Sequence, residues 1–596
     1  MDIYGKINDC VWRITDDGTL VISPEEEGAT GHLCLKKGAR DWPWCGETFR
    51  KAHIDGHVSV SENAGGMFSA CTTLEDVSGL KKLDMSGVRD MSSMFTGCHA
   101  LKNISGLKDL DVSSAENMSH MFDGCTSLSN ISALETWPVR NVKNICAMFY
   151  NCRELKDISA LKDWNISSVT DISYLFSICT ELSDLSALKD WDTSSVTDMS
   201  YMFFDCTVIK DVSVLKGWDT SNVSKMEYMF HGCTSLEDIS SLAGWKSNNV
   251  VSTACMFYKC AALKYISALR NWNMANVSNI SGMFRDCTSL EDVSSLAGWD
   301  TAGIRYMSST FCGCIELKDI SALGNWDTSN ITNMAYLFSG CAALEDISAL
   351  KNWHTLHVEN IIGIFSGCPA LKDISALKNW RTSNIVFMSA AFSDCIALKD
   401  ASVLEDWCIS NVKSMSQMFR GCAALENING IEDWDVRKVE NMNLMFTDCT
   451  HLMGREKVLD EWQLKNSRLY GNGVERVVSE RRMFAMSDGP MACPREGPFI
   501  GWKKCRDDMI VKLLIPTDAK RSSAFSKKCR CDKALVLDII DENGCQTEIA
   551  VSRNDENFFY RKGKMVSVPD FNEDRFKECA PGIHFFMERK EAEDYV

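Results

Sequence analysis

The sequence predicts an α/β solenoid, a curved array of about 15 coils in which each coil has one short parallel strand and one short helix. Fifteen cysteines recur every 27 residues without a gap, from Cys71 to Cys449. A phenylalanine stands three places before each of them, and twelve tryptophans from Trp137 to Trp434 keep the same interval. A fixed period of roughly 20 to 50 residues is typical of solenoids, in which like residues of successive coils lie over one another.

The chain divides into four segments on this pattern. Residues 1–62 precede the repeats and residues 63–452 carry them. Residues 453–483 are mostly polar and charged, and we interpret them as a capping helix and linker. Residues 484–596 have the size of a small independent domain.

The first segment is predicted to form a β-hairpin. Val11–Ile14 and Leu20–Ser23 alternate apolar and polar residues, and Asp17-Gly18 between them is a turn signal. Such a module could cap the first coil, whose apolar edge would otherwise be bare.

Within each repeat, the residues before the cysteine are predicted to form a short helix. In the repeat of Cys206, the apolar residues Val196, Met199, Met202 and Phe203 advance by three or four places, as on one helical face. Asp192 and the hydroxyl residues after it would cap this helix. The methionines and tryptophans of the repeat are better explained as core than as an exposed binding surface.

The residues after the cysteine are predicted to form the strand. In Leu155–Leu161, Ile158 and Ala160 lie two places apart and would point the same way. The position five places after the cysteine would then face outward, and it is mostly aspartate. The aspartates of this column are Asp76, Asp157, Asp184, Asp211, Asp238, Asp292, Asp319, Asp346, Asp373 and Asp400.

This aspartate column allows two interpretations. Each carboxylate could accept a local backbone or hydroxyl hydrogen bond at a turn. Alternatively, Asp157 to Asp400 could form an acidic face, lined by serines, that binds a basic peptide, a polar glycan or cations. We take this face as the candidate binding site.

The 28 cysteines do not suggest a disulfide framework. Coils at strand spacing would bring neighbouring cysteines within disulfide reach, but a column beside Phe and Leu favours reduced, buried thiols. The segment Met1–Lys6 lacks the apolar core of a signal peptide, and no window is long enough to span a membrane. We therefore expect a cytoplasmic, reducing location.

The formal net charge of −18 excludes some partners. Residues 484–596 have 19 Lys and Arg against 20 Asp and Glu, so the rest of the chain carries −17. An acidic array is a poor match for nucleic acid or an anionic membrane, which need cationic surface.

The tail is predicted to be a small α+β domain, with strands at Ile510–Pro516, Ala534–Ile540, Gly563–Val568 and Gly582–Phe586 and a final short helix. Cys529, Cys531, Cys579 and His584 could hold zinc, although Cys-x-Cys lacks the usual spacing. Cys579 with His584 could also form a catalytic pair. A basic stretch that includes Lys520 and Arg521 could contact nucleic acid or an acidic surface, or remain solvated.

The repeat resembles the BspA-like leucine-rich repeats, which occur in mycoplasma lipoproteins and in surface proteins of gut and oral bacteria. The residues that carry the resemblance are Met202-Phe203, Cys206, Trp218-Asp219-Thr220-Ser221, Val223 and Met226. The opening segment, Val11–Ser23 and Trp42-Pro43-Trp44, is similar to that family's N-terminal module. The resemblance implies a leucine-rich-repeat-like solenoid that mediates adhesion or other protein contacts, and a cell-surface or secreted location as the alternative.

The tail resembles an uncharacterised domain that follows repeats in bacterial and phage proteins. Ala519–Ala524, Lys528–Cys531 and Glu578–Phe586 carry this resemblance. It implies no known activity.

We therefore predict a non-enzymatic interaction or adhesion scaffold that needs no cofactor and binds a protein or glycan. The alternative is an effector, enzymatic or nucleic-acid-binding activity in the tail, with the solenoid choosing the target.

Overall fold

A computed structural model describes most of the chain: residues 3–35, 42–452, 458, 462, 498–523, 528–541, 546–553, 555, 558–571, 582–587, 589–593 and 595. The chain forms two compact units, Met1–Ala485 and Met486–Val596, and each is described by itself. The predicted helix and linker at 453–483 lie outside the described residues, apart from Val458 and Trp462.

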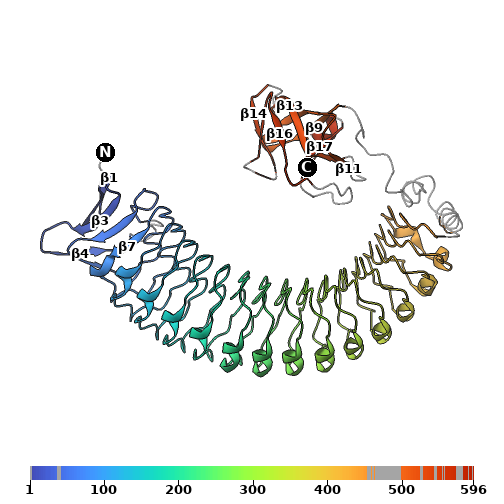
Figure 1. The fold of residues 1–596 in the computed structure, drawn as a ribbon, viewed down its shortest axis with the longest axis horizontal. Helices are drawn as coiled ribbons and strands as arrows, with labels where there is room; N and C mark the ends of the chain where they lie inside the picture. Colours follow the sequence, from blue (N-terminus) through green and yellow to red (C-terminus); the bar gives the residue numbers. More distant parts are fainter. Residues whose placement is uncertain are drawn as a thin grey trace. The chain divides into compact units, whose positions relative to one another are not determined.

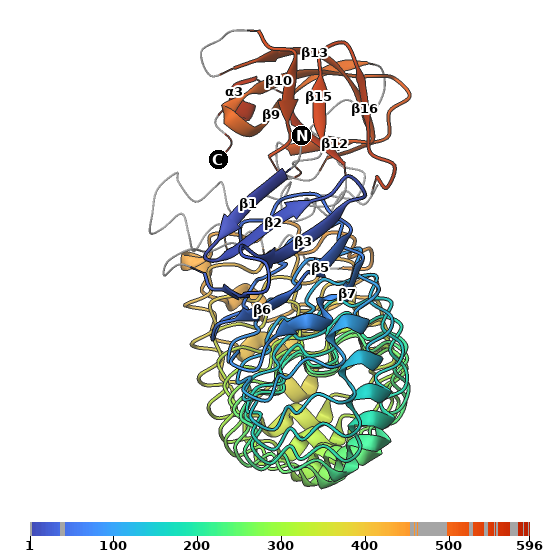
Figure 2. The same ribbon diagram turned by 90° about the vertical axis from the view of Figure 1, so that its left-hand side faces the viewer.

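The first unit begins with two small sheets. Their strands are β1 (Ile3–Ile7), β2 (Cys10–Ile14), β3 (Thr19–Pro24), β4 (Thr30–Leu33), β5 (Lys51–Ile54), β6 (His57–Val60), β7 (Asp76–Gly79) and β8 (Leu83–Asp84). One sheet has the order β1-β2-β3-β5-β7 and the other the order β4-β6-β8. Figure 2 shows the first sheet at the end of the repeat array.

The predicted hairpin is confirmed, because β2 and β3 pair antiparallel around Asp17-Gly18. β3 then pairs parallel with β5, and β5 with β7, so the hairpin continues directly into the first coil. Trp42 stacks on Trp44 at 5.5 Å, and Trp44 lies 6.2 Å from the ring of Phe68. These indoles cover the apolar end of the array.

The phenylalanines form one continuous stack through the core. Phe203 and Phe230 of adjacent coils lie 5.7 Å apart with rings 10° from parallel. The same contact joins every neighbouring pair from Phe68 to Phe446, at 5.4–6.0 Å. The prediction that like residues lie over one another in a 27-residue solenoid is confirmed.

The prediction of a helix before the cysteine is wrong. In the repeat of Cys206 this segment is a run of turns, in which Tyr201 and Asp205 have left-handed φ values of 59° and 53°. The N–H groups of Tyr201 and Phe203 donate to the next coil, to Glu227 O at 2.9 Å and Met229 O at 2.9 Å. A helix would use these groups internally. We call this segment, from seven places before the cysteine to the cysteine itself, the turn run.

The prediction of a strand after the cysteine is also wrong for most coils. Within Leu155–Leu161, Ser159–Leu161 is a 3-10 helix, and the Asp157 carboxylate accepts from the Ser159 N–H at 2.8 Å and begins it. Among the fifteen repeats, only the first has a strand at the predicted position, and this strand is β7. The 3-10 helices of the array are η1 (Leu80–Lys82), η2 (Ser105–Leu107), η3 (Ser132–Leu134), η4 (Ser159–Leu161), η5 (Ser186–Leu188), η6 (Ser213–Gly217), η7 (Ser240–Gly244), η8 (Ser267–Asn271), η9 (Ser294–Gly298), η10 (Ser321–Asn325), η11 (Ser348–Asn352), η12 (Ser375–Leu377), η13 (Ser402–Asp406), η14 (Ile431–Asp433) and η15 (Val436–Lys438).

The repeated cysteines and tryptophans are hydrogen-bond donors as well as core residues. All fifteen repeated cysteines are free in this structure, and the predicted burial of the column is confirmed. The Cys206 thiol donates to Phe176 O of the preceding coil at 3.0 Å, and the Trp218 indole N–H donates to Leu188 O at 2.9 Å. Burial raises the pKa of Cys206 to about 12, so this thiol keeps the proton it donates.

The repeats follow an arc, with the 3-10 helices along its outer edge and the turn runs along its inner edge (Figure 1). Ring spacing agrees with this curvature. Stacked tryptophans of adjacent repeats lie 6.0–6.4 Å apart near the outer edge. The half-buried tyrosines of the turn runs, Tyr174, Tyr201 and Tyr228, lie only 4.3–4.5 Å from one coil to the next. The coils therefore splay outward.

The second unit is an antiparallel β domain. Its elements are β9 (Phe499–Lys504), η17 (Arg506–Asp508), β10 (Ile510–Ile515), β11 (Arg521–Ser523), β12 (Lys528–Cys531), β13 (Lys533–Ile540), β14 (Ile549–Val551), β15 (Phe559–Arg561), β16 (Met565–Ser567), β17 (Ile583–Phe586) and α3 (Arg589–Glu593). The main sheet has the order β11-β12-β17-β9-β10-β13-β16, and β14 pairs with β15. The predicted strands correspond to β10, β13, β16 and β17, and the final helix to α3. The other strands were not predicted.

Candidate functional site

One lateral face of the array carries a backbone ladder through every coil. Residues eight places before each repeated cysteine form parallel bridges from coil to coil, from Asn63 to Asn441. We call the side chains eight and nine places before these cysteines the bridge face. This ladder, before the cysteine, joins every coil to the next, whereas parallel bridges five places after the cysteine join only some coils, as between Asp211 and Asp238.

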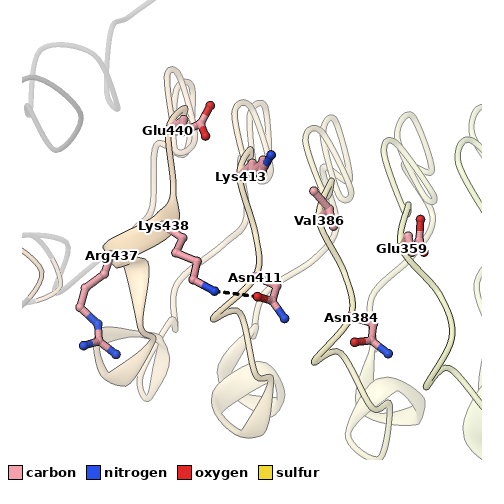
Figure 3. Close-up of a pocket in the computed structure, with 8 residues that line it drawn as sticks. All are labelled: Glu359, Asn384, Val386, Asn411, Lys413, Arg437, Lys438 and Glu440. Carbon is pink, nitrogen blue, oxygen red and sulfur yellow. Dashed lines mark hydrogen bonds between the residues drawn. The ribbon is translucent and has the colours of Figure 1, made fainter.

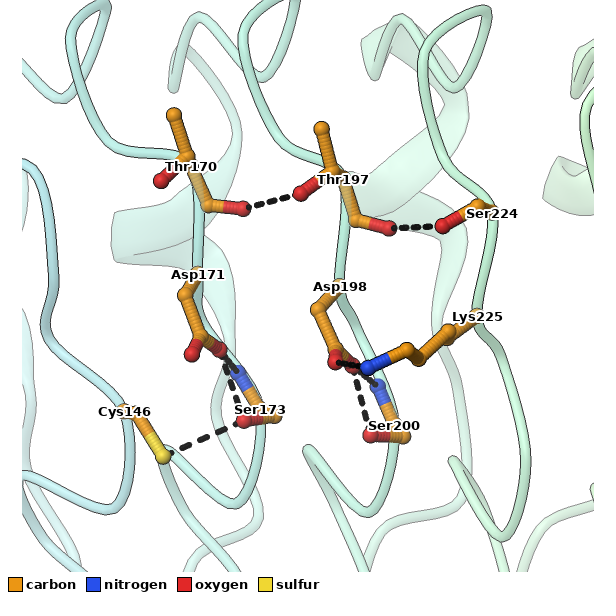
Figure 4. A network of polar contacts seen from close by, with 9 residues as sticks. All are labelled: Cys146, Thr170, Asp171, Ser173, Thr197, Asp198, Ser200, Ser224 and Lys225. Atoms are coloured by element: carbon orange, nitrogen blue, oxygen red, sulfur yellow. Dashed lines mark hydrogen bonds and ion pairs between the residues drawn. The ribbon is translucent and has the colours of Figure 1, made fainter.

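The bridge face is held by short-range polar contacts, shown in Figure 4 for three coils. Asp198 accepts from the Ser200 N–H at 3.0 Å with one carboxylate oxygen, and its other oxygen lies 2.9 Å from Lys225 Nζ. One place earlier, the hydroxyl of Thr197 donates to Thr170 O at 3.1 Å. Polar side chains at these positions therefore brace the ladder and still reach solvent.

Composition along the bridge face changes from coil to coil. Residues eight places before the cysteine include Asp198, Lys225, Tyr306 and Phe387. Tyr306 and Phe387 remain 47% and 41% exposed, and Val251, one place earlier in its repeat, is 47% exposed. Single exposed apolar side chains are ordinary, but these three share one narrow face.

In the last coils the bridge face contains an open groove of about 690 Å³. Figure 3 shows Glu359, Val386, Lys413 and Glu440, each nine places before its cysteine, along one side of it. The other lining residues are Asn384, Asn411, Arg437 and Lys438. The groove thus offers both charges, amides and one apolar side chain.

The groove wall is rigid on its asparagine side. Asn384 Nδ2 donates to Leu356 O at 2.7 Å, and Asn411 Nδ2 donates to Ser383 O at 2.8 Å. Lys438 Nζ donates to Asn411 Oδ1 at 2.8 Å. A ligand in the groove would therefore meet a preformed polar surface.

The aspartate column predicted as the binding site lies beside the 3-10 helices, outside the bridge face. Its side chains are exposed, but each has a local role. Asp157, Asp184, Asp211, Asp238, Asp292, Asp319, Asp346, Asp373 and Asp400 each accept the backbone N–H of the serine two places on, at 2.6–2.8 Å. The N–H donated by Ser159 lowers the pKa of Asp157, and Ser321 does the same for Asp319. The turn interpretation thus describes these contacts.

The residues singled out in the tail do not converge as a zinc site. In the β12–β17 pair, His584 lies opposite Arg530, whereas Cys529 and Cys531 lie opposite Phe585 and Ile583. Side chains alternate along a strand, so His584 projects to the face opposite the two thiols. Cys579, needed for both the zinc and the catalytic-pair predictions, lies outside the described residues. In the described parts of the chain no group of three or more His, Cys, Asp or Glu is placed to hold a metal ion.

Of the two basic residues singled out in the tail, Arg521 has its guanidinium engaged within its own domain, and Lys520 is held through its backbone N–H. Arg521 Nη2 donates to Pro516 O at 2.7 Å and to Thr517 O at 3.1 Å, and its guanidinium lies 5.1 Å from the Phe499 ring. The Lys520 N–H donates to Asp532 at 2.8 Å.

The fold and the bridge face define a solenoid repeat protein with a separate β domain. Residues 62–187, 181–295, 289–378 and 364–479 match the family described as "Mycoplasma protein of unknown function, DUF285", and the chain belongs to this family. The match confirms the resemblance predicted for the repeats. Residues 489–592 match a second family of unknown function, DUF5758, as expected for an uncharacterised tail domain.

One similar solved structure is a leucine-rich cell surface protein from Faecalibacterium prausnitzii. It is 17% identical, and the match covers 72% of this chain and 94% of that chain with a TM-score of 0.28. No curated protein matches the chain. Within the described residues, no helix combines the length and apolar character required for crossing a membrane.

Proposed function

We propose that this protein is a non-enzymatic scaffold that binds a partner protein through its bridge face. The observation that carries the proposal is the concentration of variable, exposed side chains on this face, among them Tyr306 and Phe387, together with the groove in its last coils. The backbone ladder beneath them is the same in every coil, so these side chains can differ without changing the fold.

The chemistry of the groove favours a protein partner. Its lining offers charges of both signs and amides, and aromatic groups stand elsewhere on the bridge face at Tyr306 and Phe387. These are the usual components of protein interfaces, in which aromatic anchors contribute much of the binding energy. The family resemblance to surface adhesion proteins supports the same class of function.

The test compares two pairs of exposed apolar side chains. The doubly substituted Tyr306→Ser/Phe387→Ser chain loses aromatic groups from the bridge face. Its matched control, Ile315→Ser/Ile396→Ser, loses equally exposed side chains one place after the cysteine. A partner would be captured from host surface extract by the full chain, purified, and its Kd measured for each variant.

We expect the bridge-face variant to weaken binding at least tenfold, about 1.4 kcal/mol, and the control to change it less than twofold. Equal effects of the two variants would place the interface elsewhere on the array. Loss of binding on substitution of Lys520 and Arg521 alone would favour the tail instead.

A further inference from the structure

A second pocket opens on the turn that follows Trp353. Its volume is about 410 Å³, and its lining includes Lys351, His354, His357 and Arg381. None of the described residues that line it is an aspartate or a glutamate, although the chain as a whole has a net charge of −18. It shares no lining residue with the groove of the bridge face. The acidic array thus contains one pocket whose ionisable side chains are all bases.

The bases of this pocket replace a carboxylate of the repeat. Thirteen places after the repeated cysteine, seven repeats have an aspartate that accepts the backbone N–H two places on, at 2.9–3.3 Å: Asp84, Asp111, Asp192, Asp219, Asp300, Asp327 and Asp435. His354 and, in the next coil, Arg381 occupy the same position. The Leu356 N–H, two places after His354, has no acceptor among the described residues. A backbone donor that other coils satisfy with a carboxylate therefore stays open in the pocket lining.

The cationic side chains of the pocket lack counter-charges. Within the described parts of the chain, neither Lys351 nor Arg381 forms an ion pair. Lys378, the equivalent of Lys351 in the next coil, differs because a glutamate oxygen lies 3.9 Å from its Nζ. Asp327 of the preceding coil does not line the pocket, and its carboxylate already accepts its own serine N–H at 2.9 Å. The pocket therefore has positive charge that the fold leaves unbalanced.

The coils around the pocket hold these groups in place. The hydroxyl of Thr328 accepts from the His354 N–H at 2.7 Å, and that of Thr355 accepts from the Arg381 N–H at 2.7 Å. His357 Nδ1 lies 2.7 Å from a carbonyl oxygen of the preceding coil. Since a carbonyl can only accept, this nitrogen carries a proton and the ring is fixed. A ligand would meet a preformed set of donors.

We propose that this pocket binds the oxyanion group of a small ligand, a carboxylate, phosphate or sulfate, in the place of the aspartate that the coil lacks. The oxyanion accepts from the Leu356 N–H and pairs with Arg381 and Lys351. Hydrogen bonds between ionised partners are shorter and stronger than neutral ones, and the planar guanidinium matches carboxylate and phosphate oxygens in geometry. This inference does not depend on the bridge-face proposal.

The experiment follows the histidine ring signals of the full chain by NMR at neutral pH, with His357 as the reporter inside the pocket. The chain has ten histidines, and the signal that disappears in His357→Gln identifies the reporter. Inorganic phosphate, sulfate and acetate are the probes, each titrated with sodium chloride adjusted to keep the ionic strength constant. We expect a saturable shift of the His357 signal with at least one probe. Preference for acetate would assign a carboxylate ligand, and preference for phosphate or sulfate a tetrahedral anion.

His354→Asp is the decisive variant, because it restores the aspartate of the other repeats. It should abolish the saturable shift without lowering the melting temperature. Arg381→Gln should weaken binding about tenfold, and Lys351→Gln by a smaller factor. Lys378→Gln, the matched control in the next coil, should leave the Kd almost unchanged.

The proposal is overturned if none of the three anions gives a saturable shift, or if chloride alone gives the same shift. It is equally overturned if His354→Asp binds as tightly as the natural chain. Should His354→Asp fail to fold, Arg381→Gln decides, since an unchanged Kd in that variant would refute the assignment.

Discussion

The inner and outer edges of the coils join neighbouring repeats by different means. At the inner edge, backbone groups make the link directly, as when the Phe203 N–H donates to Met229 O. At the outer edge the 3-10 helix uses its N–H groups locally, as in Leu215 N–H to Val212 O at 3.0 Å. There a side chain makes the link, from the Trp218 indole to Leu188 O.

The difference explains which surface positions can vary. Five places before the repeated cysteine, the turn run accepts Tyr201, Cys255 and Gly282 without losing its pairing, because the backbone supplies it. Twelve places after the cysteine, a residue that replaces tryptophan must still donate a hydrogen bond to the preceding coil and fill the space of the indole. Backbone pairing therefore leaves the inner edge free to carry different surface chemistry.

Phe203→Ala should cause the largest loss, since it removes a fully buried ring from the middle of the stack. We expect a loss of about 3–5 kcal/mol in the free energy of unfolding, measured by urea denaturation of the full chain. Phe203→Leu should lose clearly less. Similar losses for the two would mean that the coils are held chiefly by backbone pairing.

Trp218→Phe tests the outer edge alone. It keeps an aromatic ring but leaves Leu188 O with only the longer bond from the Trp191 N–H at 3.4 Å, so the lost hydrogen bond should cost about 1 kcal/mol. Tyr265→Phe, which removes an exposed hydroxyl, is the control and should be nearly neutral. A neutral Trp218→Phe would show that stacking, rather than the indole N–H, links the outer edge.

Two histidines of the turn runs should give opposite pH dependence. Burial and Lys259 lower the pKa of His231 to about 4 from its ordinary 6.5, so the unfolded chain binds the proton more readily. Stability should fall by about 1–2 kcal/mol as pH drops from 6.5 towards 4. The hydrogen bond to Asp123 raises the pKa of His120 to about 10, so its contribution is complete below pH 6.5 and is lost as pH rises towards 10.

These slopes can be measured by thermal melts across pH. His231→Phe should flatten the acid limb only, and His120→Gln the alkaline limb only. If either variant flattened both limbs, the two sites would not titrate independently.

Asp319→Ala should give the smallest effect, about 0.5–1 kcal/mol, because it removes the acceptor for the Ser321 N–H at an exposed turn. Asp319→Asn keeps an oxygen acceptor and should behave almost like the natural chain in the same urea titration. If neither substitution changed the free energy of unfolding, the hydrogen bond from the Ser321 N–H to Asp319 would not stabilise the fold.

The period and the core could be predicted from the sequence, but the secondary structure of the coil could not. The three-residue spacing of Phe203 and Cys206 fits a helix, in which residues three and four apart share a face, and equally a run of turns, in which bonds such as Cys206 N–H to Phe203 O join residues three apart. Their burial is therefore the same in either structure. The turn run differs from a helix in its left-handed backbone conformation at Tyr201 and Asp205, and a tyrosine in the sequence does not predict such a conformation.

The candidate binding site differs from the predicted one for a related reason. The aspartate column was predicted as the binding site because it recurs regularly. This regularity reflects the hydrogen bond that each aspartate accepts from the N–H of its serine, as Asp157 does from Ser159. The bridge face is irregular, with Lys225, Tyr306 and Phe387 at equivalent positions, and periodicity cannot single it out. The distinction depends on knowing which positions are paired in every coil, and this requires the three-dimensional structure.

The closer ring spacing at the inner edge has a consequence for how such proteins change. Since each repeat bends the array in the same sense, loss or gain of one 27-residue unit by recombination would alter the length of the arc and leave every remaining column intact. The span available to a bound protein could thus be tuned in whole-repeat steps, without any new residue having to evolve in the core.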